Sequence, residues 1–111
     1  MEKDIFQSKI ERTANIPNIP ENREKRLLNG ALGLCGEAGE VAEIIKKTYF
    51  QGHKLSKEDI KEELGDVLWY FAFIMNTLGL NFSEVMEANV QKLNKRYPKK
   101  FTSEKSINRE L

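Results

Sequence analysis

The sequence predicts an all-α protein, and three observations support this class. Apolar residues recur at intervals of three and four along most of the chain, which is the period of an amphipathic helix. No stretch alternates apolar and polar residues as a half-buried strand does. Proline and glycine lie between the periodic stretches and divide them. We therefore expect a single domain over residues 1–111, an antiparallel bundle of four main helices, with 98–111 as a polar, irregular C-terminal tail.

The N-terminal half of the chain predicts a short helix, a loop and a long helix. Residues 2–14 form the first amphipathic stretch. Two prolines exclude helix from residues 15–20, because proline lacks a backbone N–H and restricts the residue before it. The second helix is expected from residue 21 or 22 to about residue 50, where a glycine follows.

The C-terminal half predicts two further helices with recognisable ends. Ser56 supplies an N-cap for the third helix, and Gly79 ends it. Either Asn81 or Ser83 caps the fourth helix, which continues to Arg96 before a Tyr-Pro pair. All four helices are therefore bounded by short loops.

The third helix carries apolar residues around nearly its whole circumference. Its aliphatic residues fill one stripe, and Trp69, Tyr70 and Phe73 lie outside that stripe. A helix of this kind needs cover on every side, which a chain of 111 residues supplies with difficulty. We therefore expect a homo-oligomer, either a dimer or a tetramer.

Charge and cysteine content limit the possible partners and location. Lys plus Arg number 18 and Asp plus Glu 17, so no general attraction to nucleic acid or to an anionic membrane is expected. The single cysteine, Cys35, cannot form an internal disulfide, and we expect it to be a small core residue. There is no apolar run near the length of a membrane span and no signal pattern, so we expect a cytoplasmic location.

The second helix combines an unusual number of glycines with a pair of acids. Each glycine inside a helix costs about 0.5 to 1 kcal/mol relative to alanine, which indicates close approach by another group. Glu37 and Glu40 lie one turn apart among them, on the same face. The glycines are Gly30, Gly33, Gly36 and Gly39.

The third helix repeats this pattern with Glu63 and Asp66 beside Gly65. Either acid pair alone is typical of a solvated helix face. Both pairs border an apolar stripe, however, so antiparallel packing of the two helices would bring four carboxylates together, and Glu43 is one turn further along. Converging like charges are costly unless a cation neutralises them, and all-oxygen ligation indicates Mg²⁺ or Mn²⁺.

Other chemistries fit the sequence poorly. Zinc would find only His53 and Cys35 as nitrogen or sulfur ligands, and a di-iron bundle needs Glu-x-x-His pairs that the chain lacks. DNA binding is disfavoured by the near-neutral charge and the lack of a basic recognition helix. A helical binding or dimerisation module without catalysis remains an alternative.

Both acid pairs and their surroundings resemble the MazG-like all-α nucleoside triphosphate pyrophosphohydrolases. This superfamily includes dimeric dUTPases, dCTP pyrophosphatases and phosphoribosyl-ATP pyrophosphohydrolase. The paired motif is Glu37-x-x-Glu40 followed by Glu63-x-x-Asp66. Residues 33–41 and 63–70 are most similar to the small stand-alone members from bacteria and phages. Residues 89–98 and the tail with Phe101, Ser106 and Arg109 are also similar, so the resemblance spans about residues 33–109.

The resemblance implies hydrolysis of a nucleotide between its α and β phosphates, which yields a nucleoside monophosphate and pyrophosphate and removes surplus or non-standard nucleotides. It implies that Glu37, Glu40, Glu63 and Asp66 hold Mg²⁺, with Mn²⁺ as the alternative. One of the glutamates, Glu37 or Glu40, would orient or deprotonate the attacking water. Hydrolysis of phosphoribosyl-ATP, or of dUTP or dCTP alone, remains the alternative within the superfamily.

Further residues are candidates for substrate binding. Lys46 and Lys47 follow the first acid pair along its helix, where they either contact phosphate oxygens or are solvated surface lysines. Tyr70 lies one turn beyond the second pair, where a base or sugar would stack, whereas Trp69 is expected to point to the core or an interface. By resemblance, Asn89 and Lys92 face the active site. Lys95, Arg96 and Arg109 either approach a neighbouring subunit's site or are ordinary surface charges.

Overall fold

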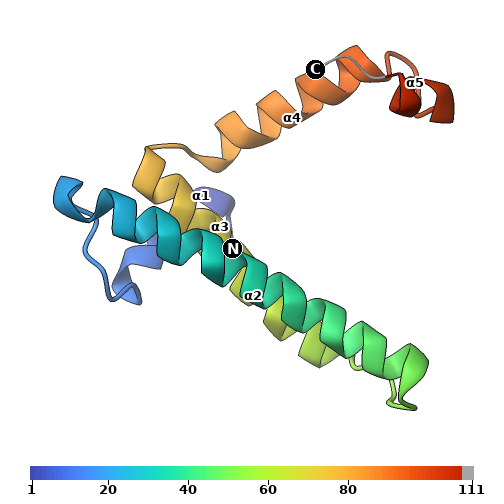
Figure 1. The fold of residues 1–111 in the computed structure, drawn as a ribbon. Helices are drawn as coiled ribbons and strands as arrows, with labels where there is room; N and C mark the ends of the chain where they lie inside the picture. Colours follow the sequence, from blue (N-terminus) through green and yellow to red (C-terminus); the bar gives the residue numbers. More distant parts are fainter. Residues whose placement is uncertain (109–111) are drawn as a thin grey trace.

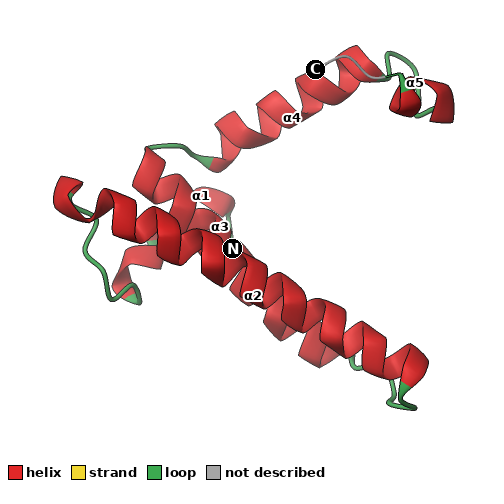
Figure 2. Cartoon of the chain, in the orientation of Figure 1, coloured by secondary structure: helices red, strands yellow, loops and turns green. Residues whose placement is uncertain are grey.

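A computed structural model describes residues 1–108 of the chain, and the regular elements of this part are helices joined by loops, without strands (Figures 1 and 2). The predicted all-α class is therefore confirmed. Within these residues no helix is both long enough and apolar enough to cross a membrane. The elements are α1 (Lys3–Ser8), the 3₁₀ turns η1 (Ile10–Arg12) and η2 (Pro20–Asn22), α2 (Arg23–Phe50), α3 (Lys57–Leu78), α4 (Phe82–Arg96) and α5 (Ser103–Ile107).

The ends of α3 and α4 follow from local sequence signals. The Ser56 side chain accepts a hydrogen bond from the backbone N–H of Asp59, and Gly79 ends α3 in the left-handed conformation at φ 69°. Asn81 caps α4 by accepting from the N–H of Glu84. Asn81, and not Ser83, is therefore the cap.

Both chain ends differ from the expected structure. The N-terminal helix stops at Ser8, and the chain tightens into η1, where Ile10 enters the core and the carboxylate of Glu11 reaches Arg26. The prediction that the C-terminal tail is irregular was wrong for residues 103–107. These residues form the short helix α5, and the Thr102 side chain caps it. Arg109 lies outside the described residues.

Helices α2 and α3 run antiparallel side by side and form the body of the molecule (Figure 1). They approach closely near the N-terminal part of α2, where a Cβ on the buried Gly30 would lie 2.6 Å from Cγ1 of Ile74. The buried core lies at this end of the hairpin and is shared by η1, α3 and the start of α4. Its members are Ile10, Ala72, Phe73, Met75 and Phe82.

Helix α4 packs through its first turn only. The ring of Phe82 contacts Phe6 of α1 and Phe71 of α3, with centroids 6.5 and 5.6 Å apart. Beyond that turn α4 leads away from α2 and α3 (Figure 1). The expected antiparallel four-helix bundle is therefore not formed within the single chain, because α4 buries no further residue after Phe82.

Much of the apolar surface of the long helices is exposed. Leu28 and Leu32 on α2 are 62% and 66% exposed, and Cys35 on the same outer face is exposed as well. The expectation that Cys35 is a core residue was wrong, because α2 packs against α3 along one face only. On α3 the ring of Phe73, expected outside the main stripe, is buried, whereas Leu68 in that stripe is 46% exposed.

Candidate metal centre and adjoining cleft

Three of the predicted acids meet where α2 packs against α3. Glu37 comes from α2, and Glu63 and Asp66 come from α3 one turn apart. A carboxylate oxygen from each lies within 4.8 Å of the others. Acids at this separation can ligate one cation together. We call Glu37, Glu63 and Asp66 the acid cluster.

Electrostatic crowding within the acid cluster raises the pKa of Glu63 above its ordinary value. The largest cause is hydrogen bonding with the Glu37 side chain, which favours the protonated form of Glu63. Desolvation and the negative charges of Glu37, Asp66 and Glu40 act in the same direction. A divalent cation would neutralise the charge of these carboxylates, and the oxygen-only donor set fits Mg²⁺ or Mn²⁺.

Two other acids of α2 lie outside this close group. Glu40 is exposed, and its charge still contributes to the raised pKa of Glu63. Glu43 is not part of the acid cluster, and its carboxylate pairs with Lys46 at 3.5 Å and with Lys47 at 3.9 Å. Exposed pairs of this kind are weak, so both lysines can exchange Glu43 for another anion.

An open cleft of about 320 Å³ adjoins the acid cluster. Two cluster members and two aromatic rings line it, together with one residue from the N-terminal segment, by which we mean residues 1–22 before α2. The lining residues are Thr13, Glu37, Asp66, Trp69 and Tyr70. The cleft therefore places carboxylates and aromatic faces side by side.

The glycines of the helix pair have different surroundings. The ring of Tyr70 lies directly against Gly33, so a Cβ at residue 33 would overlap it. Gly33 thus provides clearance for a cleft side chain, as Gly30 does for Ile74. Positions 36, 39 and 65 have no atom within 4 Å of an added Cβ, so close approach within the chain does not explain them.

Trp69 and Thr13 are cleft residues that sequence reasoning missed. Trp69 packs against the core, as the sequence predicted. It also lines the cleft, which was not predicted. Its position three residues after Asp66 on a helix was the available signal. Its indole N–H donates to the hydroxyl of Thr13 at 2.9 Å. Thr13 gave no signal, because it reaches the cleft from 56 residues away in the chain.

The structure does not bring the α4 candidates to the cleft of their own chain. Asn89 and Lys92 are exposed on α4 and are not among the cleft-lining residues. Lys95 and Arg96 lie at the end of the same helix. A role at a metal centre would therefore require the acid cluster of another subunit.

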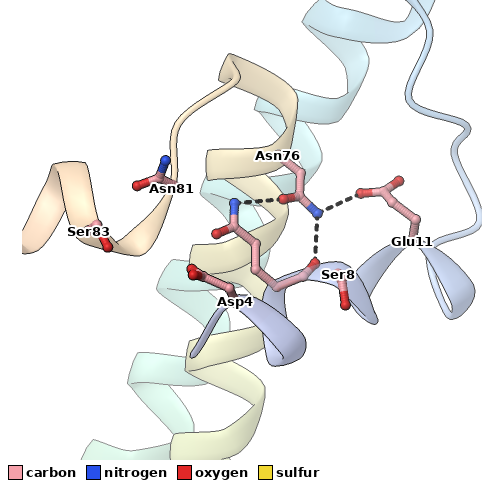
Figure 3. A pocket seen from close by; sticks show the side chains of 7 residues that line it. Asp4, Ser8, Glu11, Asn76, Asn81 and Ser83 are labelled. Atoms are coloured by element: carbon pink, nitrogen blue, oxygen red, sulfur yellow. Dashed lines mark hydrogen bonds between the residues drawn. The ribbon is translucent and has the colours of Figure 1, made fainter. Parts of the chain in front are cut away.

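A second hollow, of about 400 Å³, lies where α1, α3 and the start of α4 meet (Figure 3). Its polar groups largely satisfy one another. The Asn76 amide donates to Glu11 at 3.0 Å and to the backbone oxygen of Gln7, whose own amide donates to Asn76 at 2.9 Å. These hydrogen bonds attach the N-terminal segment to α3.

Comparisons with known proteins show the family of the chain. A family model described as the MazG nucleotide pyrophosphohydrolase domain matches residues 26–101. The Gene 37 protein of Mycobacterium phage L5 is 35% identical over 101 residues, which cover 86% of this chain and 89% of the phage protein. No solved structure matches the chain. The chain therefore belongs to the MazG nucleotide pyrophosphohydrolase domain family.

Proposed function

We propose that the protein is a Mg²⁺-dependent pyrophosphohydrolase that converts nucleoside or deoxynucleoside triphosphates into monophosphates and pyrophosphate. Family membership supports the reaction class. The observation that carries the proposal is the acid cluster, in which three carboxylates from two helices lie within 4.8 Å of one another. Such a cluster is electrostatically unfavourable alone, and a divalent cation with a phosphate ligand resolves the repulsion.

The cluster residues would hold the cation, and a bound Mg²⁺ neutralises phosphate charge and acidifies water. Glu37, Glu63 and Asp66 provide the oxygen ligands. Glu40, one turn from Glu37 and outside the close group, accepts the proton of the attacking water. The water oxygen bonds to the α phosphorus, the bond to the bridging oxygen breaks, and pyrophosphate leaves with that oxygen. The protein mainly positions these groups in line.

Basic and aromatic residues would bind the remaining parts of the substrate. Lys46 and Lys47 contact phosphate oxygens after releasing Glu43. Tyr70 lies in the cleft beside the acid cluster, where it stacks with the base or sugar. The substrate thus extends from the carboxylates to the aromatic side of the cleft.

A homo-oligomer would supply the α4 residues. Helix α4 exposes Met86, Val90 and Leu93, spaced by four and three residues, so they form an apolar stripe. A second copy covers this stripe and the outer face of α2, and Asn89 and Lys92 then serve the metal centre of the neighbouring subunit. This arrangement gives α4 the packing that it lacks within one chain.

Product analysis tests the function. The purified protein is incubated with Mg²⁺ and a panel of nucleotides that includes the standard triphosphates, dUTP, dCTP and phosphoribosyl-ATP. We expect pyrophosphate and the monophosphate, with no orthophosphate, and loss of product when Mg²⁺ is chelated. Release of orthophosphate, or no product from any nucleotide, would exclude this function. Activity confined to one member of the panel would identify the substrate.

A further inference from the structure

The aromatic side of the cleft is an ordered stack of rings. Trp69 lies nearly parallel to Phe73, with centroids 5.2 Å apart and an interplanar angle of 20°. Its other neighbour is Tyr70, which meets it edge to face at 5.0 Å. Phe73 is buried in the core, whereas Trp69 and Tyr70 reach the cleft. Trp69 therefore rests on a buried ring, and Tyr70 rests on Trp69.

Two contacts from outside α3 hold this stack. The Thr13 hydroxyl accepts the indole N–H of Trp69 and in turn donates to the backbone oxygen of Ile10. The guanidinium of Arg26 lies 4.0 Å from the centre of the Phe73 ring, the buried member of the stack. The stack is thus held at its indole edge and at its buried end.

Arg26 also attaches the N-terminal segment to the helix pair. Its side chain is 0% exposed and makes a bidentate pair with Glu11 at 2.7 and 2.8 Å. It further donates to the backbone oxygen of Ile16 at 2.7 Å and to the Thr77 hydroxyl at 2.9 Å. Glu11 lies two residues before Thr13 and is also held by Asn76 (Figure 3). The position of Thr13 therefore depends on Arg26.

From this geometry we infer that the N-terminal segment forms the nucleobase-binding side of the cleft. Thr13 and Arg26 act as positioning residues that fix Trp69 as a flat surface for the base. The segment lies before residues 26–101, which the family model matches, so it adds a wall to the site beyond the matched region. Carboxylates and aromatic rings both line the cleft, so a ligand with an anionic and a planar end can contact the carboxylates through a cation and the rings by stacking. This inference rests on the proposed function.

The chain offers a direct probe, because Trp69 is its single tryptophan. The first measurement is a fluorescence titration with Mg²⁺ and either a nucleoside monophosphate or pyrophosphate. We expect quenching by at least one of the AMP, GMP, CMP and UMP ligands and none by pyrophosphate. Equal quenching by pyrophosphate, or no quenching by any monophosphate, would contradict stacking on Trp69.

The second measurement is the kinetics of Thr13→Val, which keeps the shape of the side chain and removes the acceptor for the indole N–H. We expect KM to rise about threefold to tenfold, because one hydrogen bond that positions Trp69 is lost. The value of kcat should stay within about twofold of the wild type. Thr13→Ser restores the hydroxyl and should restore KM. The matched control is Arg12→Ala, an exposed neighbour on η1, which should leave both constants unchanged.

These outcomes separate the inference from the proposed function. If the wild type hydrolyses nucleotides but Thr13→Val keeps the wild-type KM, the inference is wrong and the function stands. A fall in kcat alone would also contradict a role in base binding. If no nucleotide is hydrolysed but monophosphates still quench Trp69, the wall binds bases and the proposed reaction is wrong. Circular dichroism of each variant verifies that it is folded.

Discussion

Arg26 is a charged side chain that the fold buries completely, and its surroundings satisfy it on every side. The guanidinium has carboxylate, hydroxyl and carbonyl acceptors and an aromatic face. Removing one partner of a buried ion pair is strongly destabilising, because the remaining charge is left without compensation. The pair between Arg26 and Glu11 should therefore contribute to stability as well as to the shape of the cleft.

The variant Glu11→Gln tests this pair through its pH dependence. The hydrogen bond from Arg26 lowers the pKa of Glu11 below its ordinary value of 4.5, so the ionised form favours the folded state. Because the Glu11 side chain is 37% exposed, solvent weakens the pair, and we expect a loss of about 1 to 2 kcal/mol in the free energy of unfolding at pH 7. The difference from the wild type should remain above pH 4.5 and shrink as the pH falls through the lowered pKa of Glu11.

Urea unfolding at a series of pH values measures this difference. Glu62→Gln is the control, because Glu62 is an exposed acid on α3. It should unfold like the wild type throughout. A wild-type free energy of unfolding in Glu11→Gln at pH 7, or a difference that grows on acidification, would show that the pair does not stabilise the fold.

At the scale of helices, the close packing of α2 on α3 depends on two glycines of α2, Gly30 and Gly33, which have no side chain. Tyr70 occupies the space that a Cβ on residue 33 would fill, and Ile74 does the same one turn earlier at Gly30. The close approach also sets where the two acid pairs meet. The glycines that contact α3 are therefore packing residues that bring Tyr70 and the acid cluster into one cleft.

The substitution Gly33→Ala should displace Tyr70 and cost about 1 to 3 kcal/mol through overpacking, less the gain in helix propensity. Gly65→Ala is the matched control, because the same change meets no atom within 4 Å and should stabilise the fold by about 0.5 to 1 kcal/mol. Thermal melting compares the two variants. If Gly33→Ala melts above Gly65→Ala, the close contact with Tyr70 does not constrain the helix pair.

The sequence predicts elements well where their signals are local. The limits of α3 follow from Ser56 and Gly79, and the acid pairs were recognisable because helical spacing and antiparallel packing together imply their meeting. The η1 turn and Thr13 could not be predicted, since their positions result from contacts with Arg26 and Trp69 far along the chain. The packing of α4 along the other helices was also mispredicted. An apolar stripe in the sequence shows that a surface covers the helix, but not which surface.

At the scale of the whole molecule, one chain leaves an unusual amount of apolar surface exposed. Leu28 and Leu32 on α2 are both more than 60% exposed, and α4 presents its own apolar stripe. Exposed apolar area of this extent usually marks an interaction surface. A second copy of the chain is the proposed partner, and it would place α4 against a neighbouring helix pair.

The variant Leu32→Glu tests this assembly by placing a charge on the outer face of α2. We expect the wild type to have a mass of at least twice 12.8 kDa and the variant to have the mass of one chain. The variant should also lose activity if Asn89 and Lys92 act across the interface. Leu55→Glu is the control, since Leu55 is 52% exposed in the loop between α2 and α3. Light scattering after size exclusion gives the masses, and a monomeric wild type would refute the assembly.

The most direct test of the central claim compares Glu63→Gln with Glu62→Gln in pyrophosphate release from a nucleoside triphosphate and Mg²⁺. The two residues are neighbours on α3, but only Glu63 belongs to the acid cluster. Loss of a cation ligand should lower kcat/KM by at least about a hundredfold in Glu63→Gln, and Glu62→Gln should keep wild-type activity. Equal activity of the two variants would contradict catalysis at the acid cluster.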